Sequence, residues 1–228
     1  MKNKFLWGLT FFPIFITLGA LPFVPDQIPA HFDLAGQVDR WGSKYELFLL
    51  PVTIVLMTFF FAGLNRIYKK KLLTAKSDKE IEEAKLNSGI LTDISIGTVI
   101  YFSAMQLTML YNSIAPLKGL EQKMALDISS VMTACMGVFL IFIGNVMGRV
   151  KKNGVLGLRT SWSMKNDRIW AKSNRFAGKL FVAAGFVVII ASAVLKGSTA
   201  VWVMLAVLWV VAFLSIVYSY RAAKKDCP

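Results

Sequence analysis

Six long apolar runs without a charged residue constrain the fold of this chain more than any other feature. A helix of about 20 apolar residues crosses the hydrocarbon core of a bilayer. The 228-residue chain is 56% hydrophobic and only 17% charged, which is too apolar for a soluble domain of this size. We therefore predict an all-α fold, a polytopic membrane bundle of six transmembrane helices. The runs cover residues 5–25, 47–65, 94–117, 128–148, 180–195 (the shortest) and 197–220.

The net charge of +13 is distributed unevenly between the segments that join these runs. With both termini in the cytoplasm, the cytoplasmic segments hold 21 of the 26 Lys and Arg residues. Such an excess is the positive-inside bias that orients membrane proteins. The basicity therefore predicts cytoplasmic N and C termini and contact with membrane lipids, and it gives no reason to expect direct nucleic-acid binding.

The most basic segment is 149–179, which has nine cations and one anion, Asp167. Ser163 and the polar residues after it predict the start of a helix. Along that helix five cations recur every three or four residues and so share one face. Attraction to an anionic leaflet would by itself explain such a stripe, without a protein partner. The stripe consists of Lys165, Arg168, Lys172, Arg175 and Lys179.

The residues before this stripe predict a structured loop, because they combine turn formers with a guanidinium and an aromatic ring. They are Asn153, Gly157, Arg159, Thr160 and Trp162. We expect Arg159 to organise the loop or to bind an acidic group through two parallel hydrogen bonds, which lysine does poorly. We expect Trp162 and Trp170 to anchor at the membrane interface. Arg159→Ala should impair function more than Lys172→Ala.

Residues 25–46 form the predicted outer loop, which is acidic where the inner segments are basic. Alternation of apolar and polar residues over 28–34 predicts a short extended piece near the membrane surface, and Trp41 suits an interfacial anchor. The single histidine, His31, has Asp26, Asp33 and Asp39 close by in sequence, which permits a weak metal site. A hydrogen-bonded surface histidine is the more ordinary role, so we predict no metal and no cofactor.

Two polar residues fall within or beside the predicted spans. Asp93 lies near the start of the third span and Asn145 near the end of the fourth. An Asp at the bilayer centre costs about 2.5–3.5 kcal/mol, so Asp93 should face water, the headgroups or a partner. Together with Gln106, these residues support a second hypothesis, a small proton-coupled transporter. No broken pair of spans of the kind that marks transporter sites accompanies them.

Two sets of residues resemble known families. The first resembles a small membrane domain of uncharacterised function that often precedes an SdpI-type domain; it comprises Pro29, His31, Phe32, Gly36, Asp39, Trp41 and Lys44. The second resembles the signature of the SdpI family of bacterial membrane proteins. It comprises Gly144, Asn145, Met147, Asn153, Gly157, Leu158, Arg159, Thr160, Trp162, Trp170, Asn174, Arg175 and Gly178. Ser161 and Ser163 depart from the commoner proline and threonine, which puts the turn geometry in doubt.

This resemblance implies an accessory domain at residues 1–72 and an SdpI-like domain at 73–228, in the bacterial cytoplasmic membrane. It implies immunity to a secreted killing-factor peptide, with signalling through sequestration of a small cytoplasmic repressor. The outer-loop set would meet the toxin, and the inner set would meet a partner. The chain has no metalloprotease, nucleophile-elbow or phosphate-loop motif, and we expect it not to be an enzyme.

Overall fold

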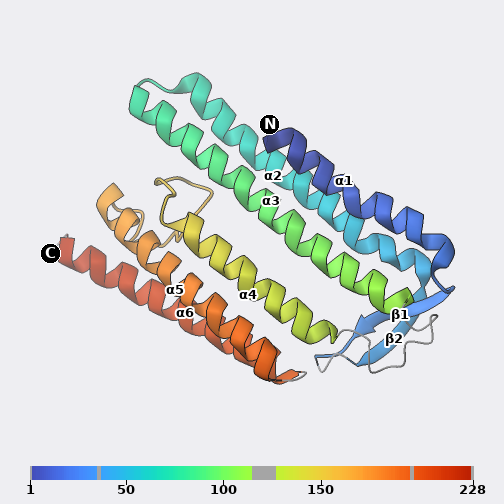
Figure 1. The fold of residues 1–228 in the computed structure, drawn as a ribbon. Coiled ribbons are helices and arrows are strands. Elements are labelled where there is room, and N and C mark those ends of the chain that lie inside the picture. The colour runs from blue at the N-terminus through green and yellow to red at the C-terminus, as the bar shows by residue number, and fades with distance from the viewer. Residues whose placement is uncertain (1, 35–36, 115–126, 196–197, 227–228) are drawn as a thin grey trace.

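The computed structural model describes residues 2–34, 37–114, 127–195 and 198–226. Among these residues, helices dominate and one two-stranded antiparallel sheet interrupts them (Figure 1). The elements in chain order are α1 (Lys2–Ala20), the short 3₁₀ helix η1 (Leu21–Phe23), β1 (Gln27–Phe32), β2 (Val38–Ser43), a second 3₁₀ helix η2 (Lys44–Phe48), α2 (Leu49–Thr74), α3 (Asp78–Ile114), α4 (Ile128–Met147), α5 (Asp167–Val194) and α6 (Ser198–Asp226).

Within the described residues, six helices are long and apolar enough to cross a membrane, which confirms the predicted spans. Several of them extend beyond the apolar runs. The 37-residue α3 starts well before its run, where the Oγ of Ser77 accepts a hydrogen bond from the Glu80 N–H at 3.3 Å. The Glu80 carboxylate in turn accepts one from the Lys76 N–H at 2.8 Å. This reciprocal cap explains why the polar start of α3 is helical outside the apolar region.

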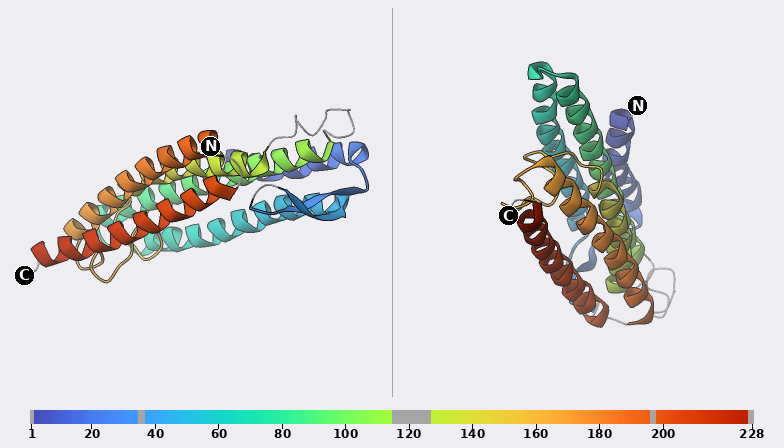
Figure 2. Two further views of the ribbon diagram at one scale, coloured as in Figure 1. Left: turned by 90° about the horizontal axis from the view of Figure 1, so that it is seen from below. Right: turned by 90° about the vertical axis from the view of Figure 1, so that its left-hand side faces the viewer.

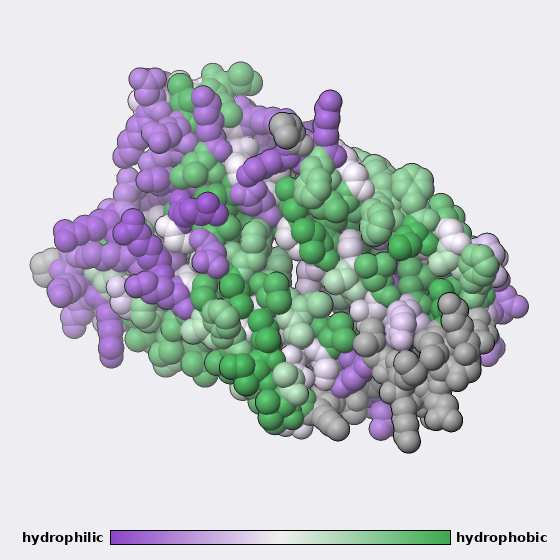
Figure 3. Space-filling model, in the orientation of Figure 1, coloured by the Kyte–Doolittle hydropathy of each residue, from purple (hydrophilic) through white to green (hydrophobic). Residues whose placement is uncertain are grey.

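Large apolar side chains cover the middle of the bundle instead of filling a core. Trp209 is 77% exposed and Phe213 is 66% exposed. Hydrophilic side chains gather at the end of the molecule that holds the C-terminus, and hydrophobic ones cover its middle (Figure 3). Contiguous exposed apolar surface of this extent is unfavourable in water and suits a lipid environment.

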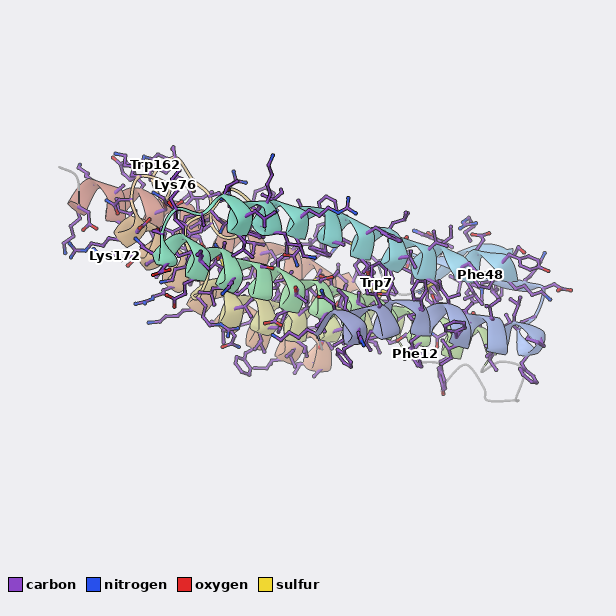
Figure 4. The ribbon with its side chains drawn as sticks, turned by 90° about the horizontal axis from the view of Figure 1, so that it is seen from above. Trp7, Phe12, Phe48, Lys76, Trp162 and Lys172 are labelled. Carbon is purple, nitrogen blue, oxygen red and sulfur yellow. The ribbon has the colours of Figure 1, made fainter. Side chains whose placement is uncertain are left out.

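The α2–α3 turn, the α4–α5 loop and both described termini lie toward one end of the bundle, and the hairpin β1–β2 lies at the other (Figure 1). We call the first the inner end and the hairpin end the outer end, after the predicted orientation. Trp162, Lys76 and Lys172 are at the inner end, Phe48 is at the outer end, and Trp7 and Phe12 lie along α1 (Figure 4).

Helices α1–α3 form one group and α4–α6 a second group beside it (Figures 1 and 2). Helix α3 packs against α1 and α2 in its own group and also against α4. It therefore belongs to the packing of both predicted domains, and the boundary at residue 72 remains a prediction.

The closest helix pair is α4–α5, where two pairs of glycines bring the backbones together. A β-carbon at Gly144 would lie 2.5 Å from the carbonyl oxygen of Gly178, and one at Gly185 would lie 2.5 Å from the carbonyl oxygen of Gly137. Small residues at such a crossing allow the backbone contact that drives helix association in lipid. Gly144 and Gly178 of the signature thus serve the close packing of these two helices.

The outer loop folds as a hairpin, because β1 pairs antiparallel with β2. We predicted one extended piece at 28–34, and neither the second strand nor its register was foreseen. Ile28 is fully buried against Val24, Leu47 and Leu110, so the hairpin is fixed on the end of α3. Gly36 lies outside the described residues.

Candidate functional site

The inner loop, residues 148–166, is organised around the side chain of Asn153. Its Oδ1 accepts hydrogen bonds from the Val155 and Leu156 N–H groups, both at 2.7 Å, and from the Tyr68 hydroxyl at 2.8 Å. Its Nδ2 donates to the Lys151 carbonyl at 2.7 Å and to the Leu156 carbonyl at 3.3 Å. A buried amide that satisfies both its donor and its acceptor sides defines one geometry for the turn.

A second asparagine, Asn174 of α5, fixes the other half of the loop. It is fully buried, and its Oδ1 accepts from the Leu158 N–H at 2.7 Å. Gly157 precedes that contact with φ +97°, a conformation that side chains rarely adopt. A β-carbon there would lie 2.6 Å from Asn174 Oδ1 and 2.8 Å from the Trp170 ring. Gly157 is therefore required both by its backbone angle and by lack of space.

Thr160 and Ser163 join the loop to α6. The Thr160 N–H donates to Ser163 Oγ at 2.9 Å, the Ser163 N–H donates to Thr160 Oγ1 at 3.0 Å, and Thr160 Oγ1 lies 2.6 Å from Ser219 Oγ. The prediction that Ser163 caps α5 is wrong. Asn166 is the N-cap and accepts from the Ile169 N–H at 2.8 Å, because Ser163 is already buried within the preceding turn.

The two predicted interfacial tryptophans have different positions. Trp170 is 2% exposed, packs with Ile90 and Val146, and donates its indole N–H to the Val150 carbonyl at 2.7 Å. Its predicted role as a membrane anchor is wrong, because the loop folds over it. Trp162 is partly exposed and meets Tyr220 edge to face with ring centroids 5.3 Å apart.

Arg159 and Arg175 are exposed at the surface of this end. Arg159 makes no hydrogen bond or ion pair with any residue in the part of the chain that the structure describes, so its predicted role as loop organiser falls to Asn153 and Asn174. Its guanidinium keeps its hydrogen-bonding groups available for an external acidic group.

Two further residues hold the loop and were missed in the sequence. Tyr68 is 1% exposed at the end of α2, and Asn87 of α3 exchanges two hydrogen bonds with the backbone of Lys151 at 3.0 and 3.2 Å. Both lie more than 60 residues before the loop, so no local motif connects them to it. Tyr68 is followed by Lys69 and Asn87 by Ser88, so neither stands out from its neighbours in the sequence.

At the outer end, the predicted residues lie on the two strands of the hairpin and just after it. His31 Nδ1 is 2.6 Å from Asp39 Oδ1 across the strands, and Pro29 pairs with Trp41, which is 61% exposed. His31 is thus a hydrogen-bonded surface histidine, and Phe32 is partly buried beside it. Among the described residues, no three His, Cys, Asp or Glu side chains are grouped closely enough to hold a metal ion.

Lys44 fastens the end of the hairpin to its beginning. Its ammonium lies 2.8 Å from the Asp26 carboxylate, and its N–H donates to the Asp26 carbonyl at 3.0 Å. The hydrogen bond from Lys44 holds the pKa of Asp26 below its usual value. Because Asp26 is fully exposed, this ion pair fixes geometry more than stability.

A cavity of about 350 Å³ lies under the hairpin, between it and α3, α4 and α6. Its wall is largely apolar, and methionine side chains come from three helices. The lining includes Phe32, Leu34, Tyr101, Met109, Met132, Met136 and Met204. Methionine is flexible and polarisable, so a cavity of this kind adapts to apolar groups of varied shape.

The polar residues of the predicted transporter site do not come together. The carboxylate of Asp93 pairs with the Lys2 ammonium at 2.6 Å, near the inner end of α1. Gln106 donates to Thr17 and to the Leu47 carbonyl near the outer end. Asn145 is exposed, and its amide donates to the Ile141 carbonyl of its own helix. The three residues therefore have separate partners in separate places.

Comparison with known proteins is consistent with this architecture. Residues 149–219 match the SdpI/YfhL protein family, and residues 8–55 match a domain of unknown function, DUF1648. The chain is 26% identical over 205 residues to "Immunity protein SdpI" of Bacillus subtilis (strain 168), which covers 89% of this chain and 86% of that protein. No solved structure matches the chain. The chain is therefore a multi-pass bacterial membrane protein in which residues 8–55 are similar to DUF1648 and residues 149–219 are similar to the SdpI/YfhL family, as the sequence resemblance implied.

Proposed function

We propose that this chain is an integral membrane immunity protein that gives resistance to a secreted antimicrobial peptide and acts by binding, not by catalysis. The observation that carries the proposal is the similarity to an immunity protein along 89% of the chain. Two built surfaces at opposite ends of the bundle support it, because an external stimulus and an internal readout need separate surfaces.

At the outer end, the toxin would meet the hairpin residues and place apolar side chains in the methionine-lined cavity. The hairpin that contributes one wall of the cavity, including His31, also presents exposed Trp41 and the His31–Asp39 pair. An exposed aromatic beside an adaptable apolar cavity suits recognition of a hydrophobic or amphipathic peptide. The same arrangement would keep the peptide at the protein and away from the lipid.

The test is survival of a toxin-sensitive bacterium that expresses the chain. We expect the full chain to raise the peptide concentration that kills half of the cells. The double variant Met132→Ala, Met136→Ala should lose at least about tenfold of that protection, because a buried methionine contributes about 1.5–3 kcal/mol and 1.4 kcal/mol corresponds to tenfold in affinity.

Met57→Ala is the matched control, because Met57 lies in α2 and does not line the cavity. Membrane abundance of all variants is measured in parallel. Unchanged killing by a panel of secreted peptides in cells with normal amounts of the full chain would exclude the immunity function. Equal protection by the double variant and by Met57→Ala would exclude the cavity as the toxin site.

At the inner end, we propose that Arg159 binds an acidic group of a small cytoplasmic repressor. Arg159→Ala should lower co-purification of such a protein by about tenfold, in line with the loss of a charged interface contact. Lys165→Ala is the control, because it removes an exposed cation close to the loop and keeps the backbone hydrogen bond from residue 165 to the Trp162 carbonyl at 3.2 Å. Equal loss with both variants would indicate plain charge attraction instead of a site at Arg159.

A further inference from the structure

A basic groove lies between the inner ends of α5 and α6. Arg168 and Lys172 come from α5, and Arg221 and Lys225 come from α6. The groove has a volume of about 680 Å³ and contains one carboxylate, Asp226. Four cations therefore face one anion. Of the predicted stripe, only Arg168 and Lys172 line this groove, and Lys165 precedes α5.

The groove already binds an anionic group of its own chain. The Asp226 carboxylate accepts hydrogen bonds from the Lys172 ammonium at 2.8 and 3.1 Å, and its Oδ2 is 3.7 Å from Nε of Arg168. The Asp226 side chain is only 10% exposed. This contact demonstrates that an oxyanion fits between the two helices, yet it leaves Arg221 and Lys225 without an ion-pair partner among the described residues.

The surface next to the groove identifies the class of ligand. Phe176 and Tyr218 stack at 4.0 Å between ring centroids, one helical turn or less from the cations, and mark the start of the apolar region. Farther along α6, the exposed side chains of Leu214 and Val210 follow Lys225 and Arg221 at helical spacing, so they lie on the same side of the helix. A ligand that continues from an anionic head into hydrocarbon chains would match both parts. Basic pockets between membrane helices commonly bind anionic lipid headgroups.

We propose that this groove is a binding site for the headgroup phosphate of an anionic phospholipid, whose acyl chains lie along the exposed apolar face of α6. The phosphate is bound by Arg221 and Lys225 together with Lys172, and Asp226 competes with it for Lys172. This site is independent of the proposed immunity function. Binding at this site differs from general attraction to the leaflet, because it depends on which cations are present and not only on the total positive charge.

The test uses the full chain purified in a neutral detergent, with thermal unfolding followed as phosphatidylglycerol is added. We expect phosphatidylglycerol to raise the Tm in a saturable manner, while phosphatidylcholine and inorganic phosphate do not. Arg221→Gln with Lys225→Gln should increase the phosphatidylglycerol concentration for half of the effect by about tenfold. Asp226→Asn should lower that concentration severalfold, because it removes the competing anion.

The control is Lys179→Gln with Lys224→Gln, which removes the same charge from the same two helices outside the groove. An equal loss of lipid response in the control would overturn the proposal in favour of general charge attraction. If inorganic phosphate raised the Tm as much as phosphatidylglycerol, the ligand would not be a lipid. If an acidic peptide raised the Tm more than phosphatidylglycerol, the groove would be assigned to a protein partner. If Asp226→Asn left the phosphatidylglycerol concentration for half of the effect unchanged, Asp226 would not compete with the phosphate for Lys172, and that part of the proposal would be wrong.

Discussion

A Gly144→Leu substitution is expected to force α4 and α5 apart and to lower the Tm of the purified chain. A β-carbon at this position would lie 2.5 Å from the Gly178 carbonyl oxygen and 2.8 Å from the Val182 backbone nitrogen, so the clash is with backbone and no rotamer change relieves it. Overpacking costs about 1–3 kcal/mol and occasionally more. At the upper end of that range the Tm in detergent should fall by about 10 °C.

Gly63→Leu provides the matched control, because Gly63 is an exposed glycine of α2 whose added β-carbon meets nothing within 4 Å. Both variants are compared by thermal unfolding and by the amount recovered as a single species in size-exclusion chromatography. If Gly144→Leu and Gly63→Leu unfolded at the same temperature, the glycine contact between α4 and α5 would not stabilise the bundle.

The helices were predictable because a transmembrane span depends mainly on local composition. Each charge-free run indicates a helix by its length alone, and the polar start of α3 likewise depends on local hydrogen bonds of Ser77 and Glu80. The strand pairing of the outer hairpin depends instead on contacts outside the run, such as the burial of Ile28 against Leu110 of α3. Alternation over a few residues reveals an extended piece but not its partner.

The inner loop was recognised as a structured segment, but the roles within it were not assigned correctly. Arg159 was predicted to organise the loop through its guanidinium, whereas the fold of the loop depends on the buried amides of Asn153 and Asn174. Tyr68, which donates to Asn153, and Asn87, which bonds to the Lys151 backbone, come from distant helices. Burial of Trp170 likewise depends on how the loop folds back over α5, which residue type alone does not indicate.

The second large effect is expected for Asn153→Ala, which removes the acceptor of three hydrogen bonds from the centre of the inner loop. The N–H groups of Val155 and Leu156 and the Tyr68 hydroxyl would lose their partner. A buried donor left unsatisfied costs about 1–3 kcal/mol. Because cleavage of a folded protein follows the population of locally opened forms, trypsin should cut the loop of the detergent-solubilised chain at least about tenfold faster.

Asn145→Ala is the control, because that exposed amide bonds only to the carbonyl of Ile141 in its own helix. Tyr68→Phe removes one of the three bonds and keeps the ring, so it should give an intermediate rate. Cleavage after Lys151, Lys152 and Arg159 is followed by mass spectrometry, which places each cut within the loop. If Asn153→Ala were cut no faster than Asn145→Ala, the amide network would not hold the loop, and packing around Trp170 would have to do so. If the rate of cleavage instead rose from Asn145→Ala through Tyr68→Phe to Asn153→Ala, the folded state of the inner loop would depend on Tyr68 of α2. The two helix groups would then be connected through a side chain that no local motif identifies.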